Sequence, residues 1–162
     1  MLLALTRSVP AGITQCELTH LARAPIDRAR AVAEHAEYEA ALERLGCRVQ
    51  RLPDAPELPD SVFVEDTVVM YGDLAVITRP GADERKPETA GTEGVLRGLG
   101  YRIEHIEGPA TLDGGDVLKH GSDVWVGVGG RTSPDAVDQL GAHLAPLGAR
   151  VHPVPVTKVL HL

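Results

Sequence analysis

The chain has 162 residues, 43% of them hydrophobic, and its 16 basic and 23 acidic residues give a net charge of −7. This length suits one domain with a real hydrophobic core, and the composition excludes a disordered chain. The acidic balance, without a cluster of Lys and Arg among aromatic residues, argues against nucleic acid as a partner and favours a small cationic ligand. No apolar run approaches a membrane span and no signal peptide is recognised, so we expect no membrane partner and a cytoplasmic location.

Two cysteines, Cys16 and Cys47, are too few for a disulfide scaffold. The histidines show no metal-ligand spacing with them. We therefore expect reduced thiols, no metal and no cofactor.

The predicted elements alternate between short strands and helices. A strand over residues 2–9 and a polar loop precede an Ala-, Glu- and Arg-rich helix over 25–45, whose apolar residues recur at helical spacing. The sequence then predicts, in chain order, a strand at 47–52, strands at 64–71 and 74–79, a helix near 89–99, strands at 112–119 and 123–128, a helix near 134–147 and a strand-like run at 155–162.

One short phrase occurs three times, at 42–49, 96–103 and 144–151, and each copy contains a helix end, a glycine and a strand start. A glycine just after a helix can adopt a positive φ, which ends the helix cleanly. A pair of strands precedes the second and third copies, joined by Gly72-Asp73 and by Gly121-Ser122, which suit tight hairpins. The repeating unit is thus strand-strand-helix-strand, which predicts an internally repeated α/β fold.

We expect the whole chain, 1–162, to form a single domain, an incomplete α/β propeller with units at roughly 1–59, 60–110 and 111–155 and the first strand of a fourth. That last strand, 155–162, has no partner, and repeat architectures need covered ends. We therefore expect the chain to be part of a longer protein or to need another chain. Its exposed strand edges could also form a homo-oligomer.

Three carboxylates, Asp60, Glu65 and Asp66, lie in an apolar, strand-like run. Because the side chains of a strand alternate between its two faces, Asp66 would share a face with two valines. A carboxylate in such surroundings needs a cationic partner. The alternative is a strand end with solvated acids.

A second acidic segment, Asp113-Gly114-Gly115-Asp116, combines carboxylates with paired glycines. The glycines let the backbone approach a ligand closely, and the acids could bind a cation or orient a histidine. The alternative is an ordinary turn, since turns favour Asp and Gly. The glycine spacing does not match a dinucleotide-binding fingerprint.

Three further residues could carry chemistry. Arg85 and Arg131 occupy equivalent loops of successive repeats, so their guanidinium groups could converge on a carboxylate, although most surface arginines do not. His161 lies in the apolar run 159–162, where it could act as an acid and base at a strand end or serve as a hydrogen-bonded core residue.

Taken together and in order, five segments resemble the dimethylarginine dimethylaminohydrolases of the guanidino-group-modifying (amidinotransferase) superfamily. The segments are 60–66, 77–82, 111–116, 130–132 and 159–162. The resemblance covers essentially the whole chain and implies a pentein-type fold, a five-bladed α/β propeller of which this chain would hold the N-terminal part. It also implies hydrolysis of methylated arginine to citrulline and a methylamine through a covalent cysteine intermediate.

The same resemblance implies roles for individual residues. His161 would be the general acid and base, and Asp113 would orient it. The substrate would be bound by Glu65 and Asp66 at its guanidinium, by Asp60 and the Leu18 backbone at its amino-acid end, and by Arg85 and Arg131 at its carboxylate.

The family's nucleophilic cysteine would lie beyond residue 162, and neither Cys16 nor Cys47 matches its motif. We therefore expect this chain to be inactive by itself. Two alternatives remain open. One is an arginine deiminase-like enzyme that acts on arginine itself, and the other is a catalytically silent fragment for ligand binding or assembly.

Overall fold

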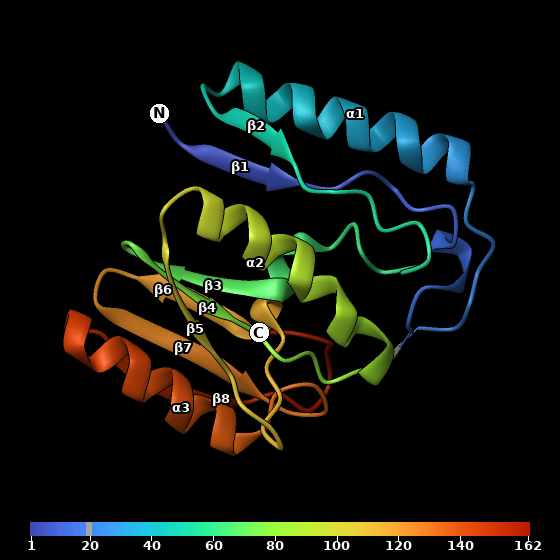
Figure 1. Cartoon of the computed structure of the whole chain (residues 1–162). Helices are drawn as coiled ribbons and strands as arrows, with labels where there is room; N and C mark the ends of the chain where they lie inside the picture. Colours follow the sequence, from blue (N-terminus) through green and yellow to red (C-terminus); the bar gives the residue numbers. More distant parts are fainter. Residues whose placement is uncertain (19–20) are drawn as a thin grey trace. The chain divides into compact units, whose positions relative to one another are not determined.

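A computed structural model describes residues 1–18 and 21–162 and divides them into two compact units, Met1–Val64 and Glu65–Leu162 (Figure 1). Both units combine strands with helices, so the predicted α/β class is confirmed. The expectation that the two units form one domain stays a prediction. Among the described residues, no helix is long and apolar enough to cross a membrane.

Unit 1 has the order strand-helix-strand. Strand β1 (Leu3–Thr6) pairs in parallel with β2 (Arg48–Arg51), and α1 (Arg28–Arg44) connects them. The predicted helix began at residue 25, but α1 starts three residues later because the Asp27 side chain caps it, accepting a hydrogen bond from the Arg30 N–H at 3.1 Å. A small apolar cluster around the 3-10 turn Ile13–Gln15 completes the unit.

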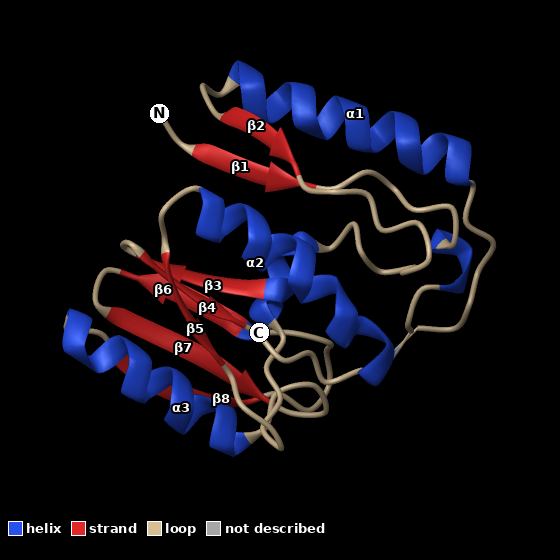
Figure 2. Ribbon diagram, viewed as in Figure 1, coloured by secondary structure: helices blue, strands red, loops and turns tan. Residues whose placement is uncertain are grey.

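Unit 2 contains two copies of the predicted strand-strand-helix-strand repeat (Figure 2). The first copy consists of β3 (Val68–Tyr71), β4 (Leu74–Ile77), α2 (Thr89–Gly98) and β5 (Arg102–His105); the second consists of β6 (Val117–His120), β7 (Asp123–Val128), α3 (Pro134–Leu144) and β8 (Arg150–Pro155). In each copy the first two strands form an antiparallel hairpin and the third pairs in parallel with the second. The predicted repeat is therefore confirmed here.

The glycines that were expected to end the helices have the backbone conformation that this role requires. Gly46, Gly100 and Gly148 have φ angles of 86°, 85° and 80°. The hairpin glycines Gly72 and Gly121 also have positive φ, at 59° and 60°. Residues with a Cβ rarely adopt this backbone conformation, which is why glycine recurs at the helix ends and in the hairpin turns.

The two repeats of unit 2 share one core. Helix α3 contributes buried residues at helical spacing, and the middle strands β4 and β7 supply much of the opposing surface. The buried members are Val69, Leu74, Val76, Ile106, Ala110, Leu112, Val124, Val126, Ala136, Val137, Leu140 and Leu144. An antiparallel bridge between Arg79 and Leu112 also joins the repeats.

Several predicted strands are shorter in the structure, and three of these differences bear on the candidate residues. The strands expected at 64–71 and 112–119 begin only at Val68 and Val117, because single 3-10 turns, Val64–Thr67 and Gly114–Asp116, precede them. The alternation of faces proposed for the run 60–66 therefore does not apply. The run 155–162 continues β8 only as far as Pro155, and the described residues beyond it form no strand, since no neighbouring strand pairs with them.

Candidate functional site

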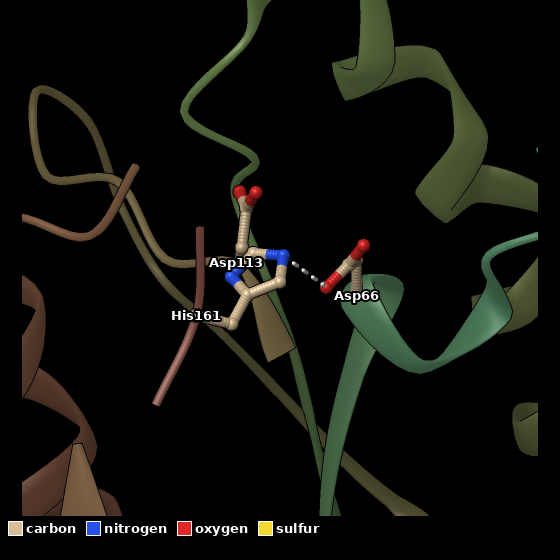
Figure 3. Close-up of side chains that lie close together, drawn as sticks. All are labelled: Asp66, Asp113 and His161. Carbon is tan, nitrogen blue, oxygen red and sulfur yellow. Dashed lines mark ion pairs between the residues drawn. The ribbon is translucent and has the colours of Figure 1, made fainter. Parts of the chain in front are cut away.

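His161 lies between two buried carboxylates in unit 2. Its Nε2 is 3.7 Å from Asp66 Oδ1, and its Nδ1 is 3.3 Å from Asp116 Oδ1. Figure 3 shows the ring beside Asp66 and Asp113, which come from different segments of the chain. Asp66 lies in the 3-10 turn before β3 and Asp116 in the turn before β6, so the two corrected boundaries are what place these acids.

Asp66 is fixed on both of its oxygens. Its Oδ2 accepts a hydrogen bond from Arg85 Nη1 at 2.8 Å, and its Oδ1 accepts one from the Gly115 N–H at 2.9 Å. The glycine is required at this approach, because a Cβ on residue 115 would lie 2.8 Å from Asp66 Oδ1 and 2.9 Å from His161 Cδ2. The paired glycines of the sequence therefore bring the second acidic segment against Asp66.

Arg85 is the cation that the sequence required beside Asp66. It lies in the 3-10 turn Asp83–Glu88 and also donates from Nη2 to Glu88 Oε2 at 3.0 Å. The side chains are only 6%, 5% and 1% exposed for Arg85, Asp66 and Glu88. Burial works against the charge, but Glu88 and Asp66 outweigh it and raise the pKa of the Arg85 guanidinium.

Asp113 is fully buried on the other side of the cluster. Its Oδ1 accepts from the Gly81 N–H at 2.8 Å, and its Oδ2 lies 4.0 Å from Arg131 Nη1. Burial raises the pKa of the Asp113 carboxyl, against the Gly81 hydrogen bond, which lowers it. The structure thus brings Arg131 to Asp113 and Arg85 to Asp66.

The three side chains in Figure 3 could also hold a metal ion, since each offers one ligand atom and these atoms lie within 4.8 Å of one another. Both aspartates already face a guanidinium group, from Arg85 and from Arg131. We therefore assign no metal to this cluster.

The surroundings favour the protonated form of His161. The adjacent Asp116 contributes most to the raised pKa of the His161 ring. Burial lowers this pKa, and the charges of Asp66 and Asp113 raise it further. A protonated imidazole carries a hydrogen on both nitrogens, and in the described residues Nδ1 lies in ion-pair contact with Asp116 and Nε2 in ion-pair contact with Asp66. The arrangement can deliver a proton from a defined ring nitrogen.

Several predicted residues lie outside this cluster. Asp60 is buried in unit 1 and accepts hydrogen bonds from the Glu17 N–H at 3.0 and 3.2 Å, while Leu18, also in unit 1, is 37% exposed. Glu65 is exposed at the start of unit 2. The expected roles of these residues stay predictions. Both cysteines belong to unit 1, and Cys16 is buried there.

Sequence reasoning assigned no role to Thr132 or Glu88, and it presented Asp116 only as one of two acids that could bind a cation or orient a histidine. Asp116 and Thr132 stand in the motifs 113–116 and 130–132, and the Thr132 hydroxyl donates to Asp116 Oδ2 at 2.6 Å. Their position in those motifs was the available signal, but nothing in the spacing indicates which acid reaches the ring. Glu88 follows Arg85 by three residues, a spacing that helical turns bring together.

No family model matches the chain. It is 46% identical to the dimethylarginine dimethylaminohydrolase of Streptomyces coelicolor over 159 residues, which cover 98% of this chain and 62% of the relative. It is 37% identical to that of Pseudomonas aeruginosa over 157 residues, 96% of this chain and 60% of the relative. The chain is thus similar in sequence, over nearly its whole length, to dimethylarginine dimethylaminohydrolases. It spans about three fifths of the length of these curated relatives.

Solved structures agree with this relationship. The dimethylarginine dimethylaminohydrolase of Pseudomonas aeruginosa, as a cysteine-to-serine variant complexed with citrulline, matches 99% of this chain and 63% of its own, with a TM-score of 0.91 and 34% identity. The N-terminal domain of ArgZ, a cyanobacterial arginine dihydrolase, matches 97% of this chain and 59% of its own, with a TM-score of 0.87 and 18% identity, a likeness of fold alone. The predicted pentein-type α/β fold is confirmed.

Proposed function

We propose that this chain carries the substrate-binding and acid–base part of an enzyme that hydrolyses N-omega-methylated arginine to citrulline and methylamine or dimethylamine. The observation that carries the proposal is His161, held between the buried carboxylates of Asp66 and Asp116 with its pKa raised. A general acid needs such a proton near neutral pH. The similarity to dimethylarginine dimethylaminohydrolases, one of them solved with citrulline, supports the substrate class.

Substrate binding would replace an ion pair that already exists within the chain, between Arg85 and Asp66. In the structure the Arg85 guanidinium occupies Asp66 Oδ2 while Glu88 holds its other side. A substrate guanidinium would replace Arg85 on Asp66, with Glu65 nearby in sequence, and the substrate carboxylate would take the freed Nη1 of Arg85. Each buried charge then keeps a partner, which avoids the large cost of an unpaired one.

The remaining predicted contacts fix the direction of the substrate. Arg131 would share its carboxylate with Arg85, and Asp60 and the Leu18 backbone would hold its amino-acid end. A cationic head among acids and an anionic tail among arginines admit only one orientation. Each charge-assisted hydrogen bond contributes about 1.5–3 kcal/mol when desolvated.

The reaction proceeds in two steps. A cysteine thiolate adds to the guanidinium carbon, and the carbon–nitrogen bond to the methylated amine breaks while His161 donates its proton to that amine. His161, with Asp113 in its surroundings, then accepts a proton from water, which adds to the carbon and displaces the thiolate to leave citrulline. Neither Cys16 nor Cys47 matches the family's nucleophile, so we expect the 162-residue chain alone to form no citrulline.

Titration calorimetry of the chain with dimethylarginine tests the binding half of this proposal. We expect binding that Asp66→Asn weakens at least tenfold, because the variant loses a carboxylate on the guanidinium. Asp73→Asn is the matched control, since Asp73 pairs with Arg102 on the surface of the same unit. Equal binding by wild type and Asp66→Asn, or no binding by either, would refute the proposed site.

Arginine serves as the second ligand in the same experiment. The fold is shared with an arginine dihydrolase, so arginine itself is the competing substrate. Tighter binding of dimethylarginine than of arginine is expected, and the reverse order would favour the arginine-specific alternative. Citrulline formation by the chain that Cys16→Ser abolishes would contradict its predicted inactivity. The cytoplasmic location remains part of this proposal, supported by the two free thiols.

A further inference from the structure

The Nδ1 side of His161 faces a short chain of buried polar groups that the family resemblance did not assign. We infer that Asp116 and Thr132 are positioning residues for His161: Thr132 fixes the Asp116 carboxylate, and Asp116 keeps the Nδ1 hydrogen in place, so that Nε2 is the nitrogen that exchanges protons with reactants. The catalytic meaning of this inference rests on the proposed function. The contacts of Thr132 and Asp116, and the tautomer of His161 that we infer from them, do not depend on the proposed function.

The direction of the Thr132 hydrogen bonds is determined. Its Oγ1 accepts from the Asp113 backbone N–H at 3.2 Å, and an N–H can only donate. The hydroxyl hydrogen is therefore available for Asp116 Oδ2, which lies at 2.6 Å. Thr132 is 0% and Asp116 2% exposed, so water does not compete for these groups. One oxygen of Asp116 is thereby held.

The other oxygen of Asp116 points at the ring. Oδ1 lies 3.3 Å from His161 Nδ1, and an ionised carboxylate can only accept a hydrogen. Among the described residues Nδ1 is a buried nitrogen without a hydrogen bond, so Asp116 Oδ1, which lies 3.3 Å away, is the acceptor that we assign to its hydrogen. Gly127 leaves room for the oxygen, because a Cβ at that residue would lie 2.8 Å from Asp116 Oδ1. The position of the Asp116 carboxylate thus depends on the glycine at residue 127.

Nε2 is left as the exchangeable nitrogen, and it faces the substrate-binding acid. It lies 3.7 Å from Asp66 Oδ1, the carboxylate to which the proposed function assigns the guanidinium. Asp113 Oδ1 accepts from the Gly81 N–H, while its buried Oδ2 makes no hydrogen bond and lies 4.0 Å from Arg131 Nη1; one Asp113 oxygen lies within 4.8 Å of a ring nitrogen of His161. Among the described residues, Asp66 and Asp116 are the acids with an oxygen within 4.0 Å of a ring nitrogen. Asp116, which lies 3.3 Å from Nδ1, is therefore the acid to which we assign the choice of tautomer.

Nitrogen NMR of the chain labelled with ¹⁵N-histidine tests this directly, with the His161 signals identified by their loss in His161→Gln. At a pH where the ring is neutral, we expect His161 to show protonated Nδ1 and bare Nε2. In Asp116→Asn the side-chain amide can donate, so the ratio of tautomers should fall at least about tenfold, the value of a charge-assisted hydrogen bond. Asp113→Asn should leave the protonated nitrogen unchanged.

Two Thr132 variants separate positioning from a general structural role. Thr132→Ser keeps the hydroxyl and should retain the wild-type tautomer, while the similarly shaped Thr132→Val should shift it toward protonated Nε2. This pair decides the matter even if Asp116→Asn fails to fold. Asp123→Asn is the control in the same unit: Asp123 pairs with His152, so that variant should change the His152 signals and leave those of His161 alone.

Unchanged His161 signals in both Asp116→Asn and Thr132→Val would overturn the inference. So would a tautomer change in Asp113→Asn but not in Asp116→Asn. The spectra require neither substrate nor turnover. A chain that shows the expected tautomer but does not bind dimethylarginine would therefore refute the proposed function alone.

Discussion

Arg85→Met should cost unit 2 much of its stability. The variant keeps the length of the side chain but removes the cation between Asp66 and Glu88, whose side chains are only 5% and 1% exposed. Removing one partner of a buried ion pair typically costs about 3–5 kcal/mol, because the remaining charge is left uncompensated. Here one guanidinium serves two carboxylates, so we expect a loss at the upper end of that range. Arg85→Lys keeps the charge but not the forked geometry and should lose less.

Urea unfolding measures this loss. The chain has one tryptophan, Trp125, which lies in β7, so its fluorescence reports on unit 2. Arg102→Met is the control: Arg102 binds both oxygens of Asp73 at 3.0 and 3.1 Å, but that pair is exposed and its loss should hardly move the unfolding midpoint. Equal midpoints for Arg85→Met and Arg102→Met would show that the buried network adds nothing to stability.

Three other predictions concern separate parts of the chain. Gly115→Ala should abolish dimethylarginine binding in calorimetry, because the new Cβ would lie 2.8 Å from Asp66 Oδ1. Leu140→Ala should destabilise unit 2 by about 2–5 kcal/mol in urea unfolding, because the side chain is fully buried. The hydrogen bond from Arg51 lowers the pKa of Glu39 to about 2, against burial, so this carboxylate should stabilise unit 1 above pH 4.5 and cease to do so as pH falls toward 2.

Each of these predictions has a matched control. Gly94→Ala lies in an exposed part of α2 with open space around it and should leave binding intact while stabilising the helix slightly. Leu118→Ala, at a residue 57% exposed, should change the free energy of unfolding by less than about 0.5 kcal/mol. In the wild-type chain the α1 helicity measured by circular dichroism should fall as the pH falls toward 2, and Glu39→Gln should remove this pH dependence. A variant that behaved like its control would contradict the corresponding prediction.

The sequence predicted best those features that depend on backbone conformation at single residues. Gly46, Gly100 and Gly148 end helices with positive φ, as their recurrence after a helical stretch indicated. The hairpins at Gly72 and Gly121 follow the same logic, because short two-residue turns select for glycine. The repeat could be found because the same local geometry is required each time.

The strand starts could not be predicted, because hydrophobicity alone does not distinguish a strand from a buried 3-10 turn. Val64 and Asp66 are both buried with the exposed Glu65 between them, which is the alternation that a strand would show, although these residues lie in a 3-10 turn. The partner of Asp66 was equally hidden, since Arg85 lies 19 residues away. Only the folded chain shows that the required cation is its own arginine.

The two 3-10 turns, Val64–Thr67 and Gly114–Asp116, also explain why a single histidine can contact two buried acids. Each repeat of unit 2 places a buried aspartate in the turn ahead of its first strand, Asp66 before β3 and Asp116 before β6. The Gly115 N–H donates to Asp66 and so ties the turns together. His161 meets one of these acids with each ring nitrogen, at 3.7 and 3.3 Å. The two nitrogens therefore differ because their acids differ: Thr132 holds Asp116 in place, whereas Asp66 pairs with Arg85, the cation that the proposed substrate would replace.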